Sequence, residues 1–269
     1  MCQSASEPAF AGIDVGSLTT KAVIISNGGI AGSGVVPTGV RPEESGPEVF
    51  RIALKAANLS EEDVAYLVAT GYGRVSSDYA DKTVTEITCH ARGAYYLHPA
   101  TRTIIDMGGQ DCKVIRVNGE GNVTDFAMND KCAAGTGRFL EVMSGVFKVD
   151  INEFGPMALR ATDAVPISST CTVFAESEVI SLIARGELPE NIISGIHSAI
   201  SNRIAGMAAR VGVEGDVFFS GGVAKNAGMK AALERSLRSS ITVPAFDPQL
   251  VGALGAAVIA ETTGRKAGA

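Results

Sequence analysis

Apolar and polar positions along the chain follow two patterns, and each pattern predicts a different kind of element. Short apolar runs that end in Asp-x-Gly and resume after a glycine turn predict strand–turn–strand units over residues 9–25 and 103–115. A third apolar strand, residues 216–220, leads through a glycine pair into a helix. Apolar residues at helical spacing predict further helices, which begin at Cys132 and Cys171 or cover residues 191–207 and 251–259. This mixture of strands and helices predicts an α/β protein.

The two strand–turn–strand units share one arrangement. Asp14 and Asp106 each close an apolar strand, and a glycine turn and a second strand follow. Taken alone, the first unit is equally well explained as an ordinary β-hairpin, but its recurrence favours an internal duplication with the two turns facing each other. Glycines let backbone amides approach a phosphate closely, and the acids can hold Mg²⁺ directly or through water.

Cys132 and Cys171 are each predicted to open a helix. Unpaired amides and the positive end of the helix dipole stabilise a thiolate there, which favours metal ligation. An iron–sulfur cube usually takes four thiolates, so a twofold-symmetric dimer would be needed to supply them. The sequence pattern by itself is also compatible with Cys132 and Cys171 being buried cysteines with a purely structural role. Cys2 is expected to be a free thiol. Structural or packing roles are expected for the remaining cysteines and the histidines: Cys89, Cys112, His90, His98 and His197.

Composition narrows the class of protein. The formal net charge of the 269 residues is −6, which argues against general binding to nucleic acid or to a membrane surface. No apolar run reaches membrane-spanning length, and the first residues lack the pattern of a secretory signal. Five cysteines, an odd number, argue against a disulfide framework. We therefore expect a cytoplasmic protein.

The two aspartate turns and the glycine pair Gly221–Gly222 occur in a specific order. This ordered set resembles the two phosphate motifs and the adenosine motif of the actin, Hsp70 and sugar-kinase ATPase superfamily. The resemblance implies two ribonuclease-H-like subdomains with a nucleotide cleft between them. Subdomain I would comprise residues 1–99 and 249–269, and subdomain II residues 100–248.

Four segments narrow the resemblance further: residues 69–74, 106–111, 129–139 and 167–183. They resemble the ATP-dependent activators of 2-hydroxyacyl-CoA dehydratases, in the BadF/BadG/BcrA/BcrD ATPase family. That family also includes ATPase subunits of benzoyl-CoA reductases and activators of double-cubane cluster proteins. The resemblance implies a homodimer with one oxygen-sensitive [4Fe–4S] cluster, ligated by Cys132 and Cys171 of both chains. Single electrons would pass from ferredoxin or flavodoxin, coupled to ATP hydrolysis, to an iron–sulfur dehydratase or reductase in an anaerobic cell.

Residue roles follow from these motifs. Four side chains are expected to organise Mg²⁺ and the attacking water: Asp14, Asp106, Gln110 and Asp111. The residues expected to contact ATP or ADP lie in the two turns, the segment before residue 137 and the adenosine motif: Gly16, Ser17, Thr19, Thr20, Lys21, Gly108, Gly109, Gly135, Gly221, Gly222, Asn226 and Gln249. Hydrolysis in such a site depends mainly on positioning and charge stabilisation.

Two other classes of function remain compatible with the sequence. A small-molecule kinase would use the same nucleotide motifs and would not need Cys132 or Cys171. A nucleotide-sensing scaffold could instead hold its dimer together with zinc at the same four thiolates. Zinc is colourless and redox-silent whereas an iron–sulfur cluster is brown and bleaches on reduction, so metal analysis discriminates between them.

Overall fold

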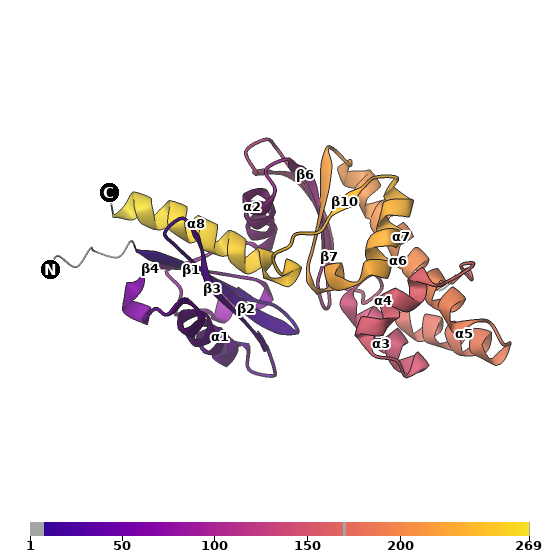
Figure 1. Ribbon diagram of the computed structural model, residues 1–269. Helices are drawn as coiled ribbons and strands as arrows, with labels where there is room; N and C mark the ends of the chain where they lie inside the picture. Colours follow the sequence, from indigo (N-terminus) through magenta and orange to yellow (C-terminus); the bar gives the residue numbers. More distant parts are fainter. Residues whose placement is uncertain (1–7, 169–170, 269) are drawn as a thin grey trace. The chain divides into compact units, whose positions relative to one another are not determined.

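The computed structural model describes residues 8–168 and 171–268, so Cys2 lies outside the described part of the chain. Contacts divide the chain into two compact units. Unit 1 contains the chain up to Pro99, the short segment Glu120–Asn122 and the chain from Leu250 onward. Unit 2 contains Ala100–Gly119 and Val123–Gln249. Each unit combines a sheet with helices, as Figure 1 shows.

Unit 1 contains a five-stranded mixed sheet with the order β3-β2-β1-β4-β5. β1, β2 and β3 pair antiparallel, whereas β4 joins β1 in parallel and β5 joins β4 in parallel. The strands are β1 (Ala9–Val15), β2 (Thr19–Ser26), β3 (Gly29–Pro37), β4 (Val64–Thr70) and β5 (Lys82–Thr83). The helices of this unit are α1 (Pro42–Ala57), α2 (Glu86–Leu97) and α8 (Val251–Ala267), with short 3₁₀ turns η1 (Glu61–Asp63) and η2 (Tyr72–Ser76).

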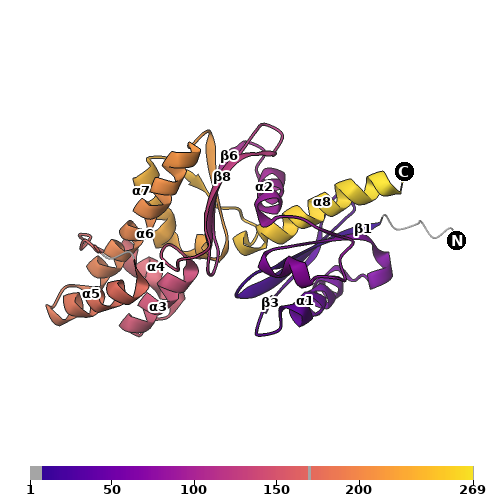
Figure 2. The ribbon, with the colours of Figure 1, turned by 180° about the vertical axis from the view of Figure 1, so that it is seen from behind.

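Strand β1 is buried along its whole length because helices cover both of its faces. Side chains alternate between the faces of a strand, so odd and even positions have different neighbours. Ala11 and Ile13 pack with α1, whereas Phe10 packs with α8. A Cβ at Gly12 would lie 2.1 Å from the carbonyl oxygen of Ala253, so glycine allows α8 to approach the strand. Helix α8 runs beside β1 and α2 in both Figure 1 and Figure 2.

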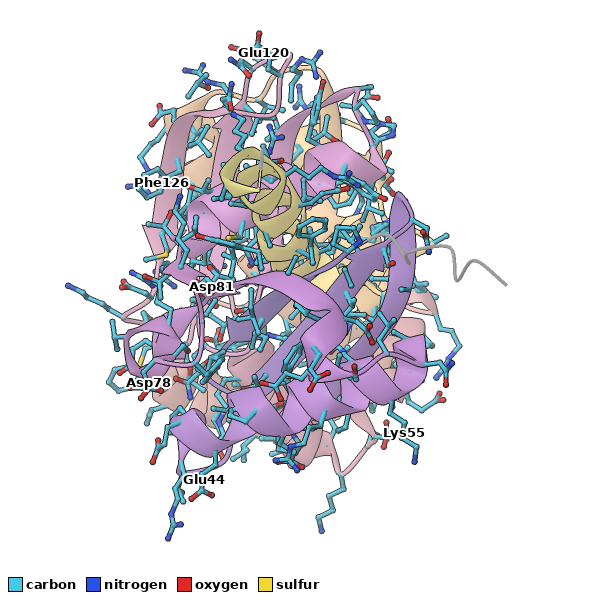
Figure 3. All side chains as sticks on the ribbon, turned by 90° about the vertical axis from the view of Figure 1, so that its left-hand side faces the viewer. Glu44, Lys55, Asp78, Asp81, Glu120 and Phe126 are labelled. Carbon is cyan, nitrogen blue, oxygen red and sulfur yellow. The ribbon has the colours of Figure 1, made fainter. Side chains whose placement is uncertain are left out.

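The outer face of α1 is polar and exposed. Glu44 lies in its first turn and Lys55 in its last, where their charges complement the helix dipole. Both side chains point outward in Figure 3. Asp81, also labelled there, directly precedes the edge strand β5. Its carboxylate accepts a hydrogen bond from the amide of Leu67 in β4 at 2.7 Å, which holds the start of β5 against its neighbour.

Unit 2 repeats this topology. Its sheet has the order β10-β9-β6-β7-β8, in which β6, β7 and β8 pair antiparallel and β9 and β10 continue in parallel. The strands are β6 (Thr101–Met107), β7 (Cys112–Val117), β8 (Val123–Asn129), β9 (Asp216–Ser220) and β10 (Ile241–Thr242). In each sheet the first strand is central, with the second and third strands on one side of it and the fourth and fifth on the other. The duplication predicted from the two aspartate turns is therefore confirmed at the level of topology.

The helices of unit 2 form a core against one face of its sheet. They are α3 (Gly137–Phe147), α4 (Ile151–Leu159), α5 (Thr172–Ala184), α6 (Pro189–Val211) and α7 (Ala227–Leu237). Two 3₁₀ turns accompany them, η3 (Gly222–Lys225) and η4 (Pro248–Leu250), and the last residue of η4 belongs to unit 1. Ile105 and Met107 of β6 and Phe219 of β9 pack with isoleucines of α6. The predicted helices over residues 191–207 and 251–259 are confirmed as parts of α6 and α8.

The predicted helix start at Cys132 is wrong, and the one at Cys171 is confirmed. Cys171 is the N-cap of α5, but α3 begins only at Gly137, with Thr136 as its N-cap. The reason is Gly135, whose φ of +89° lies outside the right-handed helical region. Ser169 and Thr170, which precede Cys171, lie outside the described residues. No helix within residues 8–168 and 171–268 is long and apolar enough to cross a membrane.

Candidate functional site

Asp14 stands at the end of β1, where the first turn begins. It is 5% exposed, and the Nζ atom of Lys21, directly across the antiparallel ladder, donates a hydrogen bond to its Oδ2 atom at 3.2 Å. The amide of Gly16 donates to the carbonyl oxygen of Thr19 at 3.1 Å, which closes the turn. The buried hydroxyl of Thr20 is hydrogen-bonded within unit 1, 2.7 Å from that of Ser45. The Thr20 side chain therefore supports the turn from inside.

The second turn has the same plan with an additional acid. Asp106, 2% exposed, stands at the end of β6 opposite Lys113, whose Nζ atom donates to its Oδ2 atom at 3.1 Å. The same ammonium group also donates to Oδ2 of Asp111. From β9, the hydroxyl of Ser220 donates to Oδ1 of Asp106 at 2.9 Å. Gln110 is exposed at the tip of the turn.

The glycine pair after β9 forms a tight backbone corner. Gly221 has a φ of +86°, and a Cβ there would lie 2.2 Å from the carbonyl oxygen of Met107. Its amide donates to the carbonyl oxygen of Pro248 at 2.9 Å. Gly222, by contrast, faces open space. This corner joins the end of β9 to the end of β6, where the second aspartate turn begins. Its hydrogen bond to Pro248 brings the next residue of the chain, Gln249, close to the glycine pair.

Asn226 caps α7, and a buried histidine supports it. The Oδ1 atom of Asn226 accepts a hydrogen bond from the amide of Met229 at 2.9 Å and lies 3.2 Å from Nε2 of His197. Nδ1 of His197 lies 2.8 Å from the carbonyl oxygen of Ile193, and burial lowers the pKa of the imidazole. The helix-packing role expected for this histidine is confirmed, since its ring also contacts that of Phe154.

Cys132 lies, partly exposed, in the loop between β8 and α3. The Nδ2 atom of Asn129 donates to the carbonyl oxygens of Cys132 and Ala134, at 2.8 and 3.2 Å. The hydroxyl of Thr136 donates to the carbonyl oxygen of Ala133 at 2.7 Å. These hydrogen bonds give the cysteine loop, residues 129–136, a defined shape that holds Cys132 near the surface.

The cysteine loop continues directly into contact with the second aspartate turn. The amide of Gly137 donates to the carbonyl oxygen of Gly108 at 2.9 Å, and the amide of Arg138 donates to that of Gly109 at 2.8 Å. The first amides of a helix lack partners within the helix, and here the turn supplies them. Predicted phosphate-binding residues and a predicted cluster ligand are thus connected through the N-terminus of α3.

Cys171 is exposed at the N-cap of α5, and the helix it opens has an apolar surface. Four large apolar side chains of this helix are 40–67% exposed: Val173, Phe174, Ile180 and Ile183. Large apolar side chains exposed together on one helix are characteristic of an interaction surface.

The other described cysteines are structural, as expected. Cys89 in α2 and Cys112 in β7 are fully buried. Burial raises the pKa of Cys89 to about 12 and that of Cys112 to about 11, so both remain neutral thiols at physiological pH. Neither presents a thiolate to a metal.

Lys113 and Ser220 contact the candidate site residue Asp106 and were not predicted from the sequence. Lys113 follows Asp106 by seven residues, as Lys21 follows Asp14, and this repeated spacing was the available signal. Ser220 had no comparable signal, because its role depends on the parallel pairing of β9 with β6.

Comparison with known proteins identifies the family. Residues 11–260 match the BadF/BadG/BcrA/BcrD ATPase family. The chain belongs to this family. It is 50% identical, over 257 residues, to the activator of lactoyl-CoA dehydratase of Anaerotignum propionicum, an alignment that covers 95% of this chain and 98% of that protein. The predicted family membership and the assignment as an ATPase are confirmed.

Two solved structures resemble the protein closely. One is component A of (R)-2-hydroxyglutaryl-CoA dehydratase from Acidaminococcus fermentans, with a TM-score of 0.92, 44% identity and coverage of 96% of this chain and 99% of that one. The other is the activator of the 2-hydroxyisocaproyl-CoA dehydratase from Clostridium difficile with bound ADPNP, with a TM-score of 0.91, 43% identity and coverage of 97% of both chains.

A more distant likeness bears on the fold alone. A ROK family glucokinase from Streptomyces griseus matches with a TM-score of 0.61 at 11% identity, over 94% of this chain and 99% of that one. The predicted actin, Hsp70 and sugar-kinase type of fold is therefore confirmed.

Proposed function

We propose that this protein is the ATP-dependent activator of a 2-hydroxyacyl-CoA dehydratase in the cytoplasm of an anaerobic cell. As a homodimer, it would take single low-potential electrons from ferredoxin or flavodoxin and pass them to the partner iron–sulfur enzyme. The similarity to dehydratase activators along nearly the whole chain supports this function. The observation that carries it is the hydrogen-bonded connection between the Gly108–Gly109 turn and the loop of Cys132, because an activator must link nucleotide to electron transfer.

The nucleotide would be ATP or ADP with Mg²⁺, bound by the residues assigned from the sequence. The ADPNP bound to the activator from Clostridium difficile supports this proposal. Carboxylate oxygens are the ligands that Mg²⁺ prefers, and Asp14 and Asp106 each present a carboxylate at the end of a strand. Since Lys21 and Lys113 already donate to these carboxylates, a water-mediated contact with the metal fits them best.

The cysteines fit a [4Fe–4S] cluster shared between two copies. Such a cluster takes four thiolates, and the described part of each chain offers two cysteines that are not buried, Cys132, partly exposed, and Cys171, exposed. The cluster would supply a one-electron donor and acceptor. The chain's own part is to hold both cysteines at the surface and to connect the loop of Cys132 to the second aspartate turn.

The surface of α5 supports the homodimer. Val173 and Phe174, each 67% exposed, lie in the first turn after Cys171, and Ile180 and Ile183 extend the face of Val173 along the helix. A second copy of α5 would bury these side chains and bring its own Cys171 to the same place. Burying one such side chain contributes about 1.5–3 kcal/mol.

The decisive experiment measures iron and acid-labile sulfide after anaerobic reconstitution. Wild type should hold about four irons and four sulfides per dimer, with a brown colour that bleaches on reduction by dithionite. Cys132→Ala and Cys171→Ala should lose them. Cys112→Ala is the matched control, because Cys112 is buried and should leave the metal content unchanged. Iron-free wild type would overturn the proposal, and zinc at the same thiolates or substrate-dependent ADP formation would support a scaffold or a kinase instead.

A further inference from the structure

Both aspartate turns carry the same charge pair across their ladders. Asp14 lies opposite Lys21, and Asp106 lies opposite Lys113. The Nζ–Oδ2 distances are 3.2 and 3.1 Å. The repetition of this pair in two separate units indicates that a lysine opposite the aspartate belongs to the plan of the turn.

The two lysines differ in burial and in the number of their partners. The side chain of Lys21 is 13% exposed and contacts one carboxylate, whereas that of Lys113 is 2% exposed and contacts two. A buried ammonium group is costly unless its partners compensate for lost hydration. Lys113 is therefore positioned by Asp106 and Asp111, and in turn it holds these two acids together.

The position of Lys113 also determines how the two acids can act. Without a cation between them, the carboxylates of Asp106 and Asp111 would repel each other in a poorly solvated region. With Lys113 present, the three groups carry one net negative charge instead of two. Ser220 fixes the other oxygen of Asp106 at 2.9 Å. The result is a rigid pair of acids with little excess negative charge beside the amides of the glycine turn.

We propose that Lys113 is a positioning residue for ATP hydrolysis, which orders Asp106 and Asp111 and lowers the negative charge that a nucleotide phosphate meets at the second turn. This inference rests on the proposed function, which assigns both acids to the nucleotide–metal site. Its physical consequence is specific. A fixed positive charge favours an anion and disfavours a cation, so its removal should weaken nucleotide binding and strengthen binding of a free divalent cation.

The test measures two binding constants on the reconstituted dimer. ADP binding is followed by calorimetry with Mg²⁺ present, and Mn²⁺ binding to the nucleotide-free protein by electron paramagnetic resonance. In Lys113→Met we expect the Kd for ADP to rise at least about tenfold and the Kd for Mn²⁺ to fall by several-fold. Lys113→Arg keeps the positive charge, so both Kd values should lie between those of Lys113→Met and wild type. Lys230→Met removes a charge from α7, away from the turn, and should change neither.

A merely structural role predicts a different result. Suppose that Lys113→Met has the same melting temperature as wild type. If it then binds ADP and Mn²⁺ both more weakly, or both with unchanged affinity, the inference is wrong. If Lys113→Met does not fold, Lys113→Gln carries the same test, because its amide can still donate to one carboxylate but has no charge. In this folded variant the Kd for ADP should rise and the Kd for Mn²⁺ should fall, and any other pattern would overturn the inference. Wild type that binds neither ADP nor Mn²⁺ would instead contradict the proposed function itself.

Discussion

The carbonyl oxygen of Gly108 accepts a hydrogen bond from the amide of Gly137 at 2.9 Å. This contact joins the second aspartate turn to the first residue of α3, five positions after Cys132. A Cβ on Gly137 would lie 3.1 Å from the same oxygen, so the close approach favours glycine at this position. A displacement of the turn by a nucleotide phosphate would therefore act directly on the end of the cysteine loop.

Gly137→Ala should weaken the response of the cluster to nucleotide. The added methyl group presses on the Gly108 oxygen and loosens its hydrogen bond, while the cysteine ligands themselves are unchanged. The measurement is the rate at which a chelator removes iron from the reduced dimer with ATP and with ADP, which should differ less in the variant than in wild type. Gly145→Ala is the control, since a Cβ there meets no atom within 4 Å and lies in the same helix. An undiminished difference in Gly137→Ala would exclude this contact as the coupling route.

Asp106→Asn should abolish most ATPase activity while the cluster remains. The neutral amide keeps the shape of the side chain but removes the charge that would order the metal and water, and such electrostatic contributions are worth about 100-fold or more in rate. Steady-state phosphate release and iron content should be measured on the same preparation. Asp125→Asn on the exposed face of β8 is the matched control. Normal turnover by Asp106→Asn would remove this aspartate from the catalytic assignment.

Much of this architecture was predictable because it rests on local signals. The apolar runs around Asp14 and Asp106 determine two hairpins, and their repetition predicts two similar sheets. The helix start at Cys132 was predicted wrongly because the left-handed conformation of Gly135 is a property of the folded loop. The bond between Ser220 and Asp106 joins residues 114 positions apart, and only the register of β9 beside β6 reveals it.

Gly221→Ala and Gly222→Ala should affect stability very differently although the residues are adjacent. Gly221 has a positive φ and no room for a Cβ beside Met107, so alanine there should lower the free energy of unfolding by about 2 kcal/mol or more. Gly222 faces open space, so alanine there should change it by less than about 0.5 kcal/mol. Urea unfolding of the whole protein measures both values. If Gly222 contacts the adenosine, Gly222→Ala should bind ADP more weakly than wild type although its stability is unchanged.

Phe174→Glu should separate the dimer into single chains. The side chain is 67% exposed on α5, so the change costs little within one chain, but it would place a charge in the proposed apolar interface. Light scattering should show the monomer, and reconstituted iron should be lost because each chain retains only two ligands. ADP binding should persist. Val213→Glu, on a separate exposed apolar side chain of unit 2, should leave the dimer intact. A dimeric, iron-replete Phe174→Glu protein would place the interface elsewhere.

His197 should make the protein less stable as the pH falls below about 6.5. Burial, assisted by the positive charge of Arg235, lowers the pKa of this imidazole in the folded chain, whereas the unfolded chain keeps an ordinary value near 6.5. The unfolded state therefore takes up a proton first, and the stability that the neutral ring contributes above the unfolded pKa is lost as pH falls through the folded pKa. Melting temperatures at pH 7 and pH 5 should differ less in His197→Gln than in wild type. His98→Gln, at the C-cap of α2, is the control. An equal decline in wild type and His197→Gln would show that other groups govern the acid response.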